Sequence, residues 1–244
     1  VGSEMCIRDS KGTVDRIIEE SVSFIQKFST IGSIITSDAI KRLDITEYPG
    51  FAIREAIANA VTHRDYADSG SQIDLYMFDD RIEIESPGTY PGHITVSNIR
   101  SERFARNPLI LRTLNRFQTA PNLDIGEGVD RMFKIMRERN LYEPLYFPPS
   151  IRPNSVLLIL FNLQRIEYWD TVSKYLDKHY RITNSEARRI TGIKDTLKMS
   201  RLLKSWVDKG LLQKVGEKAK KVVYYIKPGQ EMPSRLFSKG VENK

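Results

Sequence analysis

Ile53-Arg54-Glu55-Ala56-Ile57-Ala58-Asn59-Ala60-Val61-Thr62-His63-Arg64-Asp65 is the stretch of sequence that decides the fold. Its apolar residues recur at the spacing of an α-helix and predict one buried stripe, made of Ala52, Ile53, Ala56, Ile57, Ala60 and Val61. Glu55, Asn59 and His63 follow one another at intervals of four residues, so they share a second face of the helix. The stretch therefore predicts a buried helix that carries three polar side chains in a row.

The carboxylate of Glu55 and the amide of Asn59 suit a phosphate site. An amide carbonyl can supply a hard oxygen ligand to a Mg²⁺ ion held by phosphates, and a carboxylate can orient or deprotonate water. His63 stands at the end of the helix, where its ring could meet a phosphate or a capping carbonyl. The alternatives are a solvated polar face for Glu55 and Asn59 and a structural hydrogen bond for His63.

Three further motifs follow this helix in order. They are Ser86-Pro87-Gly88 at the end of a strand pair, Arg106-Asn107-Pro108, and Gly126-Glu127-Gly128. Together with the helix, they resemble a family of bacterial and archaeal transcriptional regulators related to the C-terminal part of the RecG helicase. The central domain of that family is similar to the GHKL ATPases, such as gyrase B and the histidine kinases. The resemblance covers about residues 11–226.

The resemblance implies a site for ATP and Mg²⁺. Asn59 matches the asparagine that coordinates Mg²⁺ on the phosphates, and Glu55 matches the general base of the hydrolysing branches. The other candidate nucleotide-binding residues are His63, Arg64, Gly88, Arg106, Gly126 and Gly128. One departure from the family pattern is Ser86, which stands where the typical ATPases have an aspartate that accepts a hydrogen bond from the adenine amino group. Serine is a poorer acceptor than aspartate and carries no charge, so this departure would weaken nucleotide binding or its specificity for adenine rather than change the fold.

Three of these candidates, Gly126, Gly128 and Arg106, also have a physical argument of their own. A Gly-x-Gly just before a helix can present backbone N–H groups to phosphates, with the helix dipole adding positive potential. Arg106, next to Asn107-Pro108 at a helix start, could reach a phosphate as a bidentate donor. The alternative for Arg106 is a salt bridge to a nearby carboxylate.

The periodicity of residues 11–165 predicts an α+β domain. Helices are expected at 13–29, around Glu55, at 109–117 and at 129–139, and strands within 32–44, at 73–77, at 82–84 and at 156–161. This order predicts an α/β sandwich with helices on one face of a mixed sheet. It corresponds to the GHKL-like ATP-binding domain that the resemblance implies.

Residues 166–228 predict a second domain, a winged helix-turn-helix. Thr183-Asn184-Ser185-Glu186 is a capping box for a helix at 184–191, and a second helix is expected at 196–209. Strands at 211–215 and 222–226 would form the wing. The candidate DNA-binding residues are Lys194, Lys198, Arg201 and Ser205 with Lys218, Lys220 and Lys221 of the wing. The alternative is a module of the same shape that binds protein.

The charge distribution favours a polyanion as partner of this second domain. Residues 166–244 hold 18 Lys+Arg against 9 Asp+Glu, a net charge of +9, whereas the whole chain carries +7 and residues 1–165 therefore carry −2. The alternative is a lysine-rich surface without a partner. The 244 residues contain one cysteine, which excludes an internal disulfide, and no apolar run of membrane-spanning length, so we expect a cytoplasmic protein.

The ends of the chain are expected to lie outside the fold. Residues 1–10, with Glu4-Met5-Cys6-Ile7-Arg8-Asp9-Ser10, look like a translated sequencing adaptor and are expected to be disordered. The gene would then be truncated upstream, where the resembled family usually carries a Schlafen/AlbA-like domain. Residues 229–244 are expected to form a flexible basic tail.

Three hypotheses for the function follow. The first is a DNA-binding transcriptional regulator with a nucleotide-responsive domain, which binds double-stranded DNA and nucleotide and could form a homodimer. The second is a slow Mg²⁺-dependent ATPase in DNA metabolism or defence, and the third is a degenerate ATP fold that serves as a scaffold for dimerisation or docking. The sequence lacks a Gly-x-x-x-x-Gly-Lys-Ser/Thr motif, so it is not a P-loop helicase.

Overall fold

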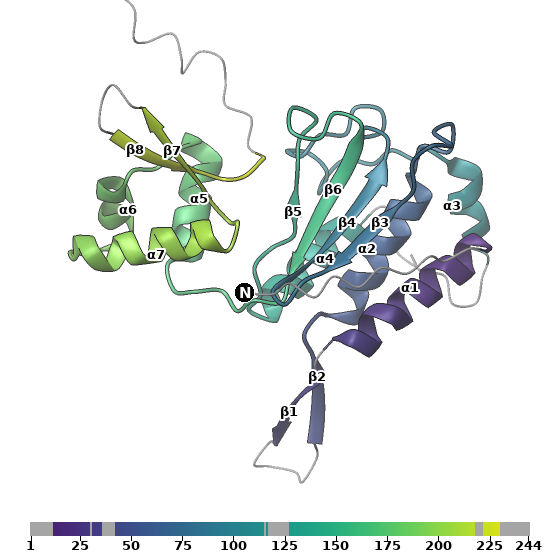
Figure 1. The fold of residues 1–244 in the computed structure, drawn as a ribbon, viewed down its shortest axis with the longest axis horizontal. Helices are drawn as coiled ribbons and strands as arrows, with labels where there is room; N and C mark the ends of the chain where they lie inside the picture. Colours follow the sequence, from purple (N-terminus) through teal and green to yellow (C-terminus); the bar gives the residue numbers. More distant parts are fainter. Residues whose placement is uncertain are drawn as a thin grey trace, which may run out of the picture. The chain divides into compact units, whose positions relative to one another are not determined.

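The computed structural model (Figure 1) describes residues 12–29, 31–35, 42–114, 116, 127–217 and 222–229, with only the backbone at 31–35, 42–46, 217 and 222. The expectations for residues 1–10 and for the tail beyond 229 therefore fall outside the described residues. The chain divides into two compact units, Val1–Arg165 and Ile166–Lys244, which we call unit one and unit two. In the described part of the chain, no helix has the length and apolar character needed to cross a membrane.

Unit one is built on a four-stranded sheet in the order β3-β4-β6-β5. The strands are β3 (Asp74–Met77), β4 (Arg81–Pro87), β5 (Leu145–Tyr146) and β6 (Ser155–Phe161). Every neighbouring pair is antiparallel, so the expectation of a mixed sheet was wrong. Two of the three pairings follow from short connections, because β3 turns into β4 at Asp79-Asp80 and β5 returns to β6 through residues 147–154. The antiparallel pairing of β6 with β4 joins strands that are distant in the sequence.

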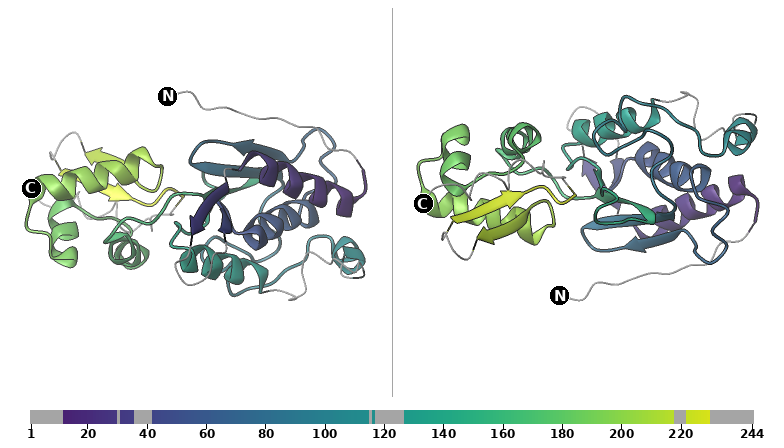
Figure 2. Two further views of the ribbon diagram at one scale, coloured as in Figure 1. Left: turned by 90° about the horizontal axis from the view of Figure 1, so that it is seen from below. Right: turned by 90° about the horizontal axis from the view of Figure 1, so that it is seen from above.

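Helices cover one face of this sheet, as expected (Figure 2). They are α1 (Val14–Phe28), α2 (Gly50–Thr62) and α4 (Gly128–Glu138), while α3 (Pro108–Leu114) follows the long loop after β4. Between α1 and α2 the chain forms a two-stranded antiparallel hairpin of β1 (Ile31–Ile35) and β2 (Arg42–Thr46). The described part of unit one is thus a mixed α+β domain with a small antiparallel sheet.

Helix α2 is the centre of the core. All six residues of its predicted stripe are buried, each 7% exposed or less, and Ala58 on another side of the helix is buried as well. The helix contacts α1, α4 and β4, so apolar neighbours surround it on several sides. Burial on more than one side explains why Glu55, expected on a polar face, is only 3% exposed.

The described residues of unit two form three helices and a two-stranded antiparallel sheet. These are α5 (Trp169–His179), α6 (Asn184–Thr191), α7 (Thr196–Asp208), β7 (Gln213–Glu217) and β8 (Val222–Ile226). A backbone bridge between Ile182 and Tyr225 adds a third extended segment beside β8. The core includes Trp169 and Trp206, whose ring centroids lie 5.2 Å apart.

Local signals set the helix ends of unit two. Thr183 and Glu186 form the expected capping box at the start of α6, and Gly192 ends that helix in the left-handed region with a φ of 74°. The carboxylate of Asp195 accepts from the backbone N–H groups of Leu197 and Lys198 and so starts α7. Asn184 on α6 donates to the hydroxyl of Ser200 on α7 over 2.9 Å, which joins the two helices.

Candidate functional site

A cavity of about 320 Å³ lies in unit one. Its lining comes from α2, β4, the loop 88–107, α3, α4, β5 and β6. Apolar side chains such as Ile84, Ile94 and Leu158 form much of the wall, and the polar groups include Glu55, Asn59 and His63. The three polar residues predicted on one face of the helix are therefore brought together in one concave site.

Glu55 is held as a buried carboxyl group in this cavity. The side-chain amide of Asn59 donates to Oε1 of Glu55 over 2.8 Å. Burial raises the pKa of Glu55 to about 6, against the opposing effects of this hydrogen bond and of the positive charge of Arg131 on α4. A carboxyl group with a pKa nearer neutrality is better matched to proton transfer than an ordinary one.

Gly128, the first residue of α4, packs directly against Glu55. A Cβ at position 128 would overlap the carboxylate, with Oε2 2.7 Å away and the other carboxylate atoms closer still. Glycine is therefore required here for a close approach between the backbone and the side chain rather than for a special turn. The approach also places the carboxylate beside the N-terminal end of α4.

His63 ends α2 and lines the cavity. Burial, with a smaller effect from the positive charge of Arg106, lowers the pKa of His63, so its ring is neutral near pH 7. Nδ1 of this ring is buried and has no hydrogen-bond partner among the described residues. An unpaired buried polar atom costs free energy, which a ligand with a complementary group would recover.

Side chains from three segments satisfy the C-terminal end of α2. The last carbonyl groups of a helix have no partner within it. Here the hydroxyl of Ser86 donates to the carbonyl of Ala60 over 2.8 Å, and the hydroxyl of Tyr66 donates to that of Val61 over 3.0 Å. The side-chain amide of Asn107 donates to the carbonyl of Thr62 over 2.9 Å. The end of the helix is thus fixed beside the cavity.

These contacts give Ser86 and Asn107 roles that the sequence did not reveal. Ser86 is 6% exposed and its only proton is used on Ala60. An ionised aspartate has no proton to donate, so it could not make this bond. Asn107 stands directly before Pro108, the first residue of α3, and its side chain also donates to the carbonyl of Arg64 over 2.8 Å, so it joins the start of α3 to the end of α2.

The remaining predicted nucleotide-binding residues lie elsewhere. The guanidinium of Arg64 donates to the carbonyls of Asp68 and Ser71, and it does not line the cavity. Arg106 pairs with Asp65 at 3.4 Å and donates to the carbonyl of Thr89. These contacts correspond to the structural alternative given for Arg106.

Gly88 adopts a φ of 104°, a backbone conformation that favours glycine, and its Cα faces Asp65 and Arg106. It is not itself a lining residue, although its neighbours Pro87 and Thr89 are. Gly126 lies outside the described residues.

Sequence reasoning missed Arg103. This residue belongs to the loop after β4 and lines the cavity, and its guanidinium lies 3.6 Å from the carboxylate of Glu127. Arg103 is outside the four motifs, so no signal in the sequence singled it out. Glu127, which would repel phosphate between its two glycines, is directed to Arg103 and its side chain is 72% exposed.

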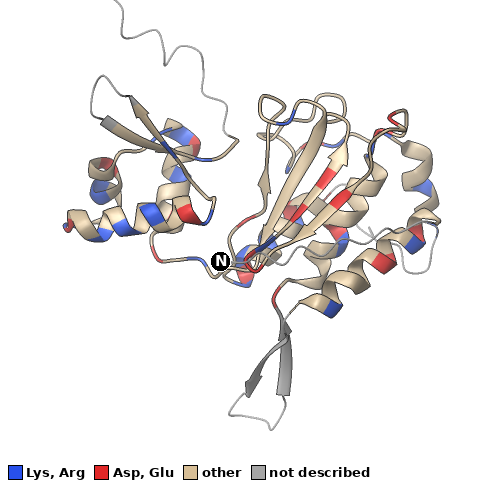
Figure 3. Ribbon diagram, viewed as in Figure 1, with Lys and Arg blue, Asp and Glu red and all other residues tan. Residues whose placement is uncertain are grey.

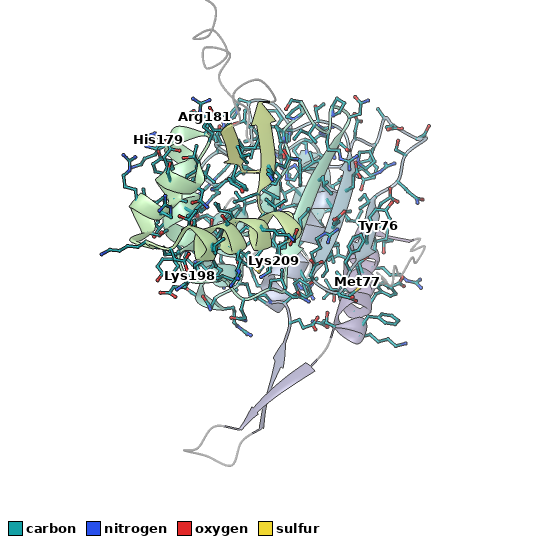
Figure 4. The ribbon with its side chains drawn as sticks, turned by 60° about the vertical axis from the view of Figure 1, so that its left-hand side comes forward. Tyr76, Met77, His179, Arg181, Lys198 and Lys209 are labelled. Carbon is teal, nitrogen blue, oxygen red and sulfur yellow. The ribbon has the colours of Figure 1, made fainter. Side chains whose placement is uncertain are left out.

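In unit two, the side chains predicted to contact DNA lie on or beside α7. Lys194, Lys198 and Arg201 are exposed and Ser205 is half-buried, while Met199, Leu203 and Trp206 are buried on the opposite side. Figure 3 shows the basic residues along α7, and Figure 4 labels Lys198 near its start and Lys209 after its end. Lys218, Lys220 and Lys221 lie outside the described residues.

Comparison with known proteins supports an ATPase-like domain in unit one. Residues 70–160 match a family model described as "Putative ATP-dependent DNA helicase recG C-terminal". The matched segment contains Ser86, Gly88 and Gly128 but not α2 with Glu55 and Asn59. No curated protein matches the chain.

Among the solved structures that match, one shows the following likeness in fold. The crystal structure of the DIP2311 protein from Corynebacterium diphtheriae matches with a TM-score of 0.50 and 21% sequence identity. The match covers 87% of this chain and 45% of that one, so the chain spans less than half the length of the DIP2311 protein. At this identity the likeness concerns the fold alone.

Proposed function

We propose that the chain is a nucleotide-responsive DNA-binding regulator, in which the cavity of unit one takes an adenine nucleotide with Mg²⁺. The observation that carries the nucleotide site is the meeting of Glu55, Asn59 and His63 in one cavity of an ATPase-like domain. A concave site with apolar walls and a few converging polar groups is the usual form of a small-molecule site.

The polar groups of the cavity suit the parts of such a ligand. Because the hydroxyl of Ser86 donates its hydrogen bond to the carbonyl of Ala60, its oxygen can only accept a hydrogen bond from a ligand. An acceptor suits an amino group such as that of adenine. The apolar walls suit the face of a purine ring. Nδ1 of His63 would find a partner in a hydroxyl or phosphate group of the ligand.

Asn59 is the residue that would hold Mg²⁺ together with the phosphates. Its Nδ2 is used on Glu55, so its Oδ1 is the atom that would serve as the ligand. The described residues contain no group of three His, Cys, Asp or Glu side chains that could hold a metal ion. This fits an ion that arrives with the nucleotide, since Mg²⁺ commonly binds through one or two protein ligands and substrate phosphates.

Calorimetry with ATP and Mg²⁺ tests the nucleotide site. The full chain should bind ATP, and binding should raise the melting temperature because the ligand binds only the folded state. Asn59→Ala should weaken binding by about tenfold or more without unfolding the protein, whereas Gln72→Ala, which removes an exposed amide outside the cavity, should bind as the unchanged chain does. An unchanged melting temperature at millimolar ATP would contradict the proposal and favour the scaffold hypothesis.

A second candidate is slow ATP hydrolysis, which the raised pKa of Glu55 favours. In this mechanism the carboxylate of Glu55 takes a proton from the attacking water, and Asn59 keeps the carboxylate in place. Glu55→Gln should then keep ATP binding and reduce phosphate release by about 10²-fold or more. Equal phosphate release from the unchanged chain and the variant would rule this candidate out.

For unit two we propose a winged helix that binds double-stranded DNA through α7. The order α5, α6, α7, β7, β8 and the exposed basic side chains of α7 support this assignment. The polar contacts between α6 and α7 would fix the angle of the recognition helix: Arg188 donates to Asn184 on its own helix and to the carbonyl of Lys194 before α7.

Fluorescence anisotropy of the full chain with labelled duplex DNA tests this assignment. Arg201→Ala should lower the affinity and flatten the dependence of log affinity on log salt by roughly 0.9 if Arg201 contacts one phosphate. Lys174→Ala removes an exposed charge from α5 and should leave both quantities nearly unchanged. If the full chain ignores duplex DNA at low salt, unit two should be reassigned as a protein-docking module.

A further inference from the structure

The charged side chains that line the cavity are mostly acidic. They are Glu55 on α2 and Glu102 in the loop after β4, with Arg103 as the single Lys or Arg among the described lining residues. Residues 117–126, outside the described residues, contain no Lys or Arg that could add a positive charge. A phosphate group in this cavity would therefore meet two carboxyl groups, and Arg103 is the Lys or Arg side chain among the described lining residues that could attract it.

The other arginines near the cavity are engaged in structural contacts. Arg106 pairs with Asp65 and Thr89, and Arg64 donates to two backbone carbonyls. The guanidinium of Arg131 lies over the ring of Phe51, 4.5 Å from its centroid. None of these three lines the cavity.

Arg103 differs from them because its partner is weakly held. Its guanidinium lies 3.6 Å from Glu127, and the two side chains are 56% and 72% exposed. An ion pair that is open to solvent contributes little and is readily exchanged. Arg100 in the same loop shows the contrast: it pairs with Asp130 at 2.7 Å and lies over the ring of Phe133, so it fastens the loop to α4 independently of Arg103.

We propose that Arg103 is the phosphate-binding residue of the cavity and that it exchanges Glu127 for a phosphate of the bound nucleotide. This inference rests on the proposed nucleotide site and adds that the ligand is recognised by its phosphates. A guanidinium can bind a phosphate through two parallel hydrogen bonds, which are stronger than a solvent-exposed pair with a carboxylate. The site thus binds nucleotides more tightly than the corresponding nucleosides, which lack phosphate.

Calorimetry of the full chain with ATP and with adenosine, each with Mg²⁺, tests the exchange. The unchanged chain should bind ATP more tightly than adenosine. Arg103→Ala should weaken ATP binding by about 10-fold to 100-fold, the usual effect of losing a hydrogen bond to a charged group, and leave adenosine binding within about twofold. Glu127→Gln removes the competing charge and should strengthen ATP binding by about twofold to fivefold, since an exposed pair contributes little.

Arg100→Ala is the matched control because it removes the same charge from the same loop without touching the cavity. It should leave the ratio of the two affinities unchanged. If Arg103→Ala and Arg100→Ala weaken ATP and adenosine alike, Arg103 only supports the loop and the inference is overturned. An ATP affinity that Arg103→Ala does not change also overturns it. Binding of adenosine but not ATP refutes the phosphate role alone, whereas binding of neither refutes the proposed nucleotide site and this inference with it.

Discussion

Gly128→Ala should destabilise unit one, and the cost should disappear when Glu55 is removed. The added Cβ would overlap the Glu55 carboxylate, with Oε2 2.7 Å away. The carboxylate has little room to give way because Glu55 is 3% exposed and is bonded to Asn59. The substitution therefore overpacks a buried contact rather than straining the backbone.

The magnitude follows from two opposing effects. Overpacking a well-packed site costs about 1–3 kcal/mol of the free energy of unfolding. Replacing glycine by alanine in a helix returns roughly 0.5–1 kcal/mol, because glycine loses more conformational entropy on folding. The net cost should be about 1–2 kcal/mol, which lowers the melting temperature by roughly 2–8 °C for a domain of this size.

Urea denaturation followed by circular dichroism gives the double-mutant cycle. In the Glu55→Ala background the carboxylate is absent, so Gly128→Ala should be neutral or slightly stabilising, and the coupling between the two sites should be about 1 kcal/mol or more. Gly70→Ala is the control, since its Cβ would lie 3.6 Å from Asp68, an ordinary contact distance. An equal cost of Gly128→Ala in both backgrounds would refute the close packing of Gly128 on Glu55.

Three further predictions concern stability. Burial raises the pKa of Glu55 from 4.5 to about 6, so ionisation of this group costs the folded state about 2 kcal/mol. The free energy of unfolding of the unchanged chain should therefore fall by about this amount as the pH rises from about 4.5 through 6. Urea denaturation at several pH values should show this fall in the unchanged chain but not in Glu55→Gln. Asn107→Ala leaves the carbonyls of Thr62 and Arg64 without this donor and should lower the free energy of unfolding by about 1–3 kcal/mol. Thermal unfolding measures this change, and an unchanged melting temperature would contradict the prediction. Thr183→Ala breaks the capping box of α6 and should lower the free energy of unfolding of unit two by about 0.5–2 kcal/mol. Denaturation followed by tryptophan fluorescence measures this change, because both tryptophans lie in unit two. A change below about 0.5 kcal/mol would contradict the prediction.

The elements with local signals could be predicted from the sequence. The apolar stripe of α2 gave its buried side, the short gap between the strands expected at 73–77 and 82–84 gave the hairpin of β3 and β4, and Thr183 with Glu186 gave the start of α6. In each case neighbouring residues alone determine the structure: a helical period, a tight turn or a capping box. The direction of β5 and β6 against β4 depends on pairing between distant segments, so the sequence did not reveal that the sheet is antiparallel throughout.

The site could be predicted only along one helix. Glu55, Asn59 and His63 lie on one turn after another of α2, so their spacing was enough to place them together. Arg64 follows directly in the sequence, yet its side chain turns to carbonyls of the next loop because the helix has ended at Thr62. Arg103 reaches the cavity from a loop without a repeating pattern, so only the folded chain shows that it belongs there.

The end of α2 links the stability of unit one to the chemistry of its cavity. Ser86 satisfies a carbonyl at the end of α2 and also lines the cavity, while His63 ends the same helix and presents a buried ring nitrogen without a partner. A residue at position 86 that keeps the hydrogen bond to the carbonyl of Ala60 and also accepts one from a ligand needs both a donor and an acceptor. Serine meets both demands with one hydroxyl group, whereas an ionised aspartate meets only the second. Serine at position 86 thus satisfies a carbonyl at the end of α2, and in the proposed nucleotide site its oxygen would still accept a hydrogen bond from an amino group of the ligand.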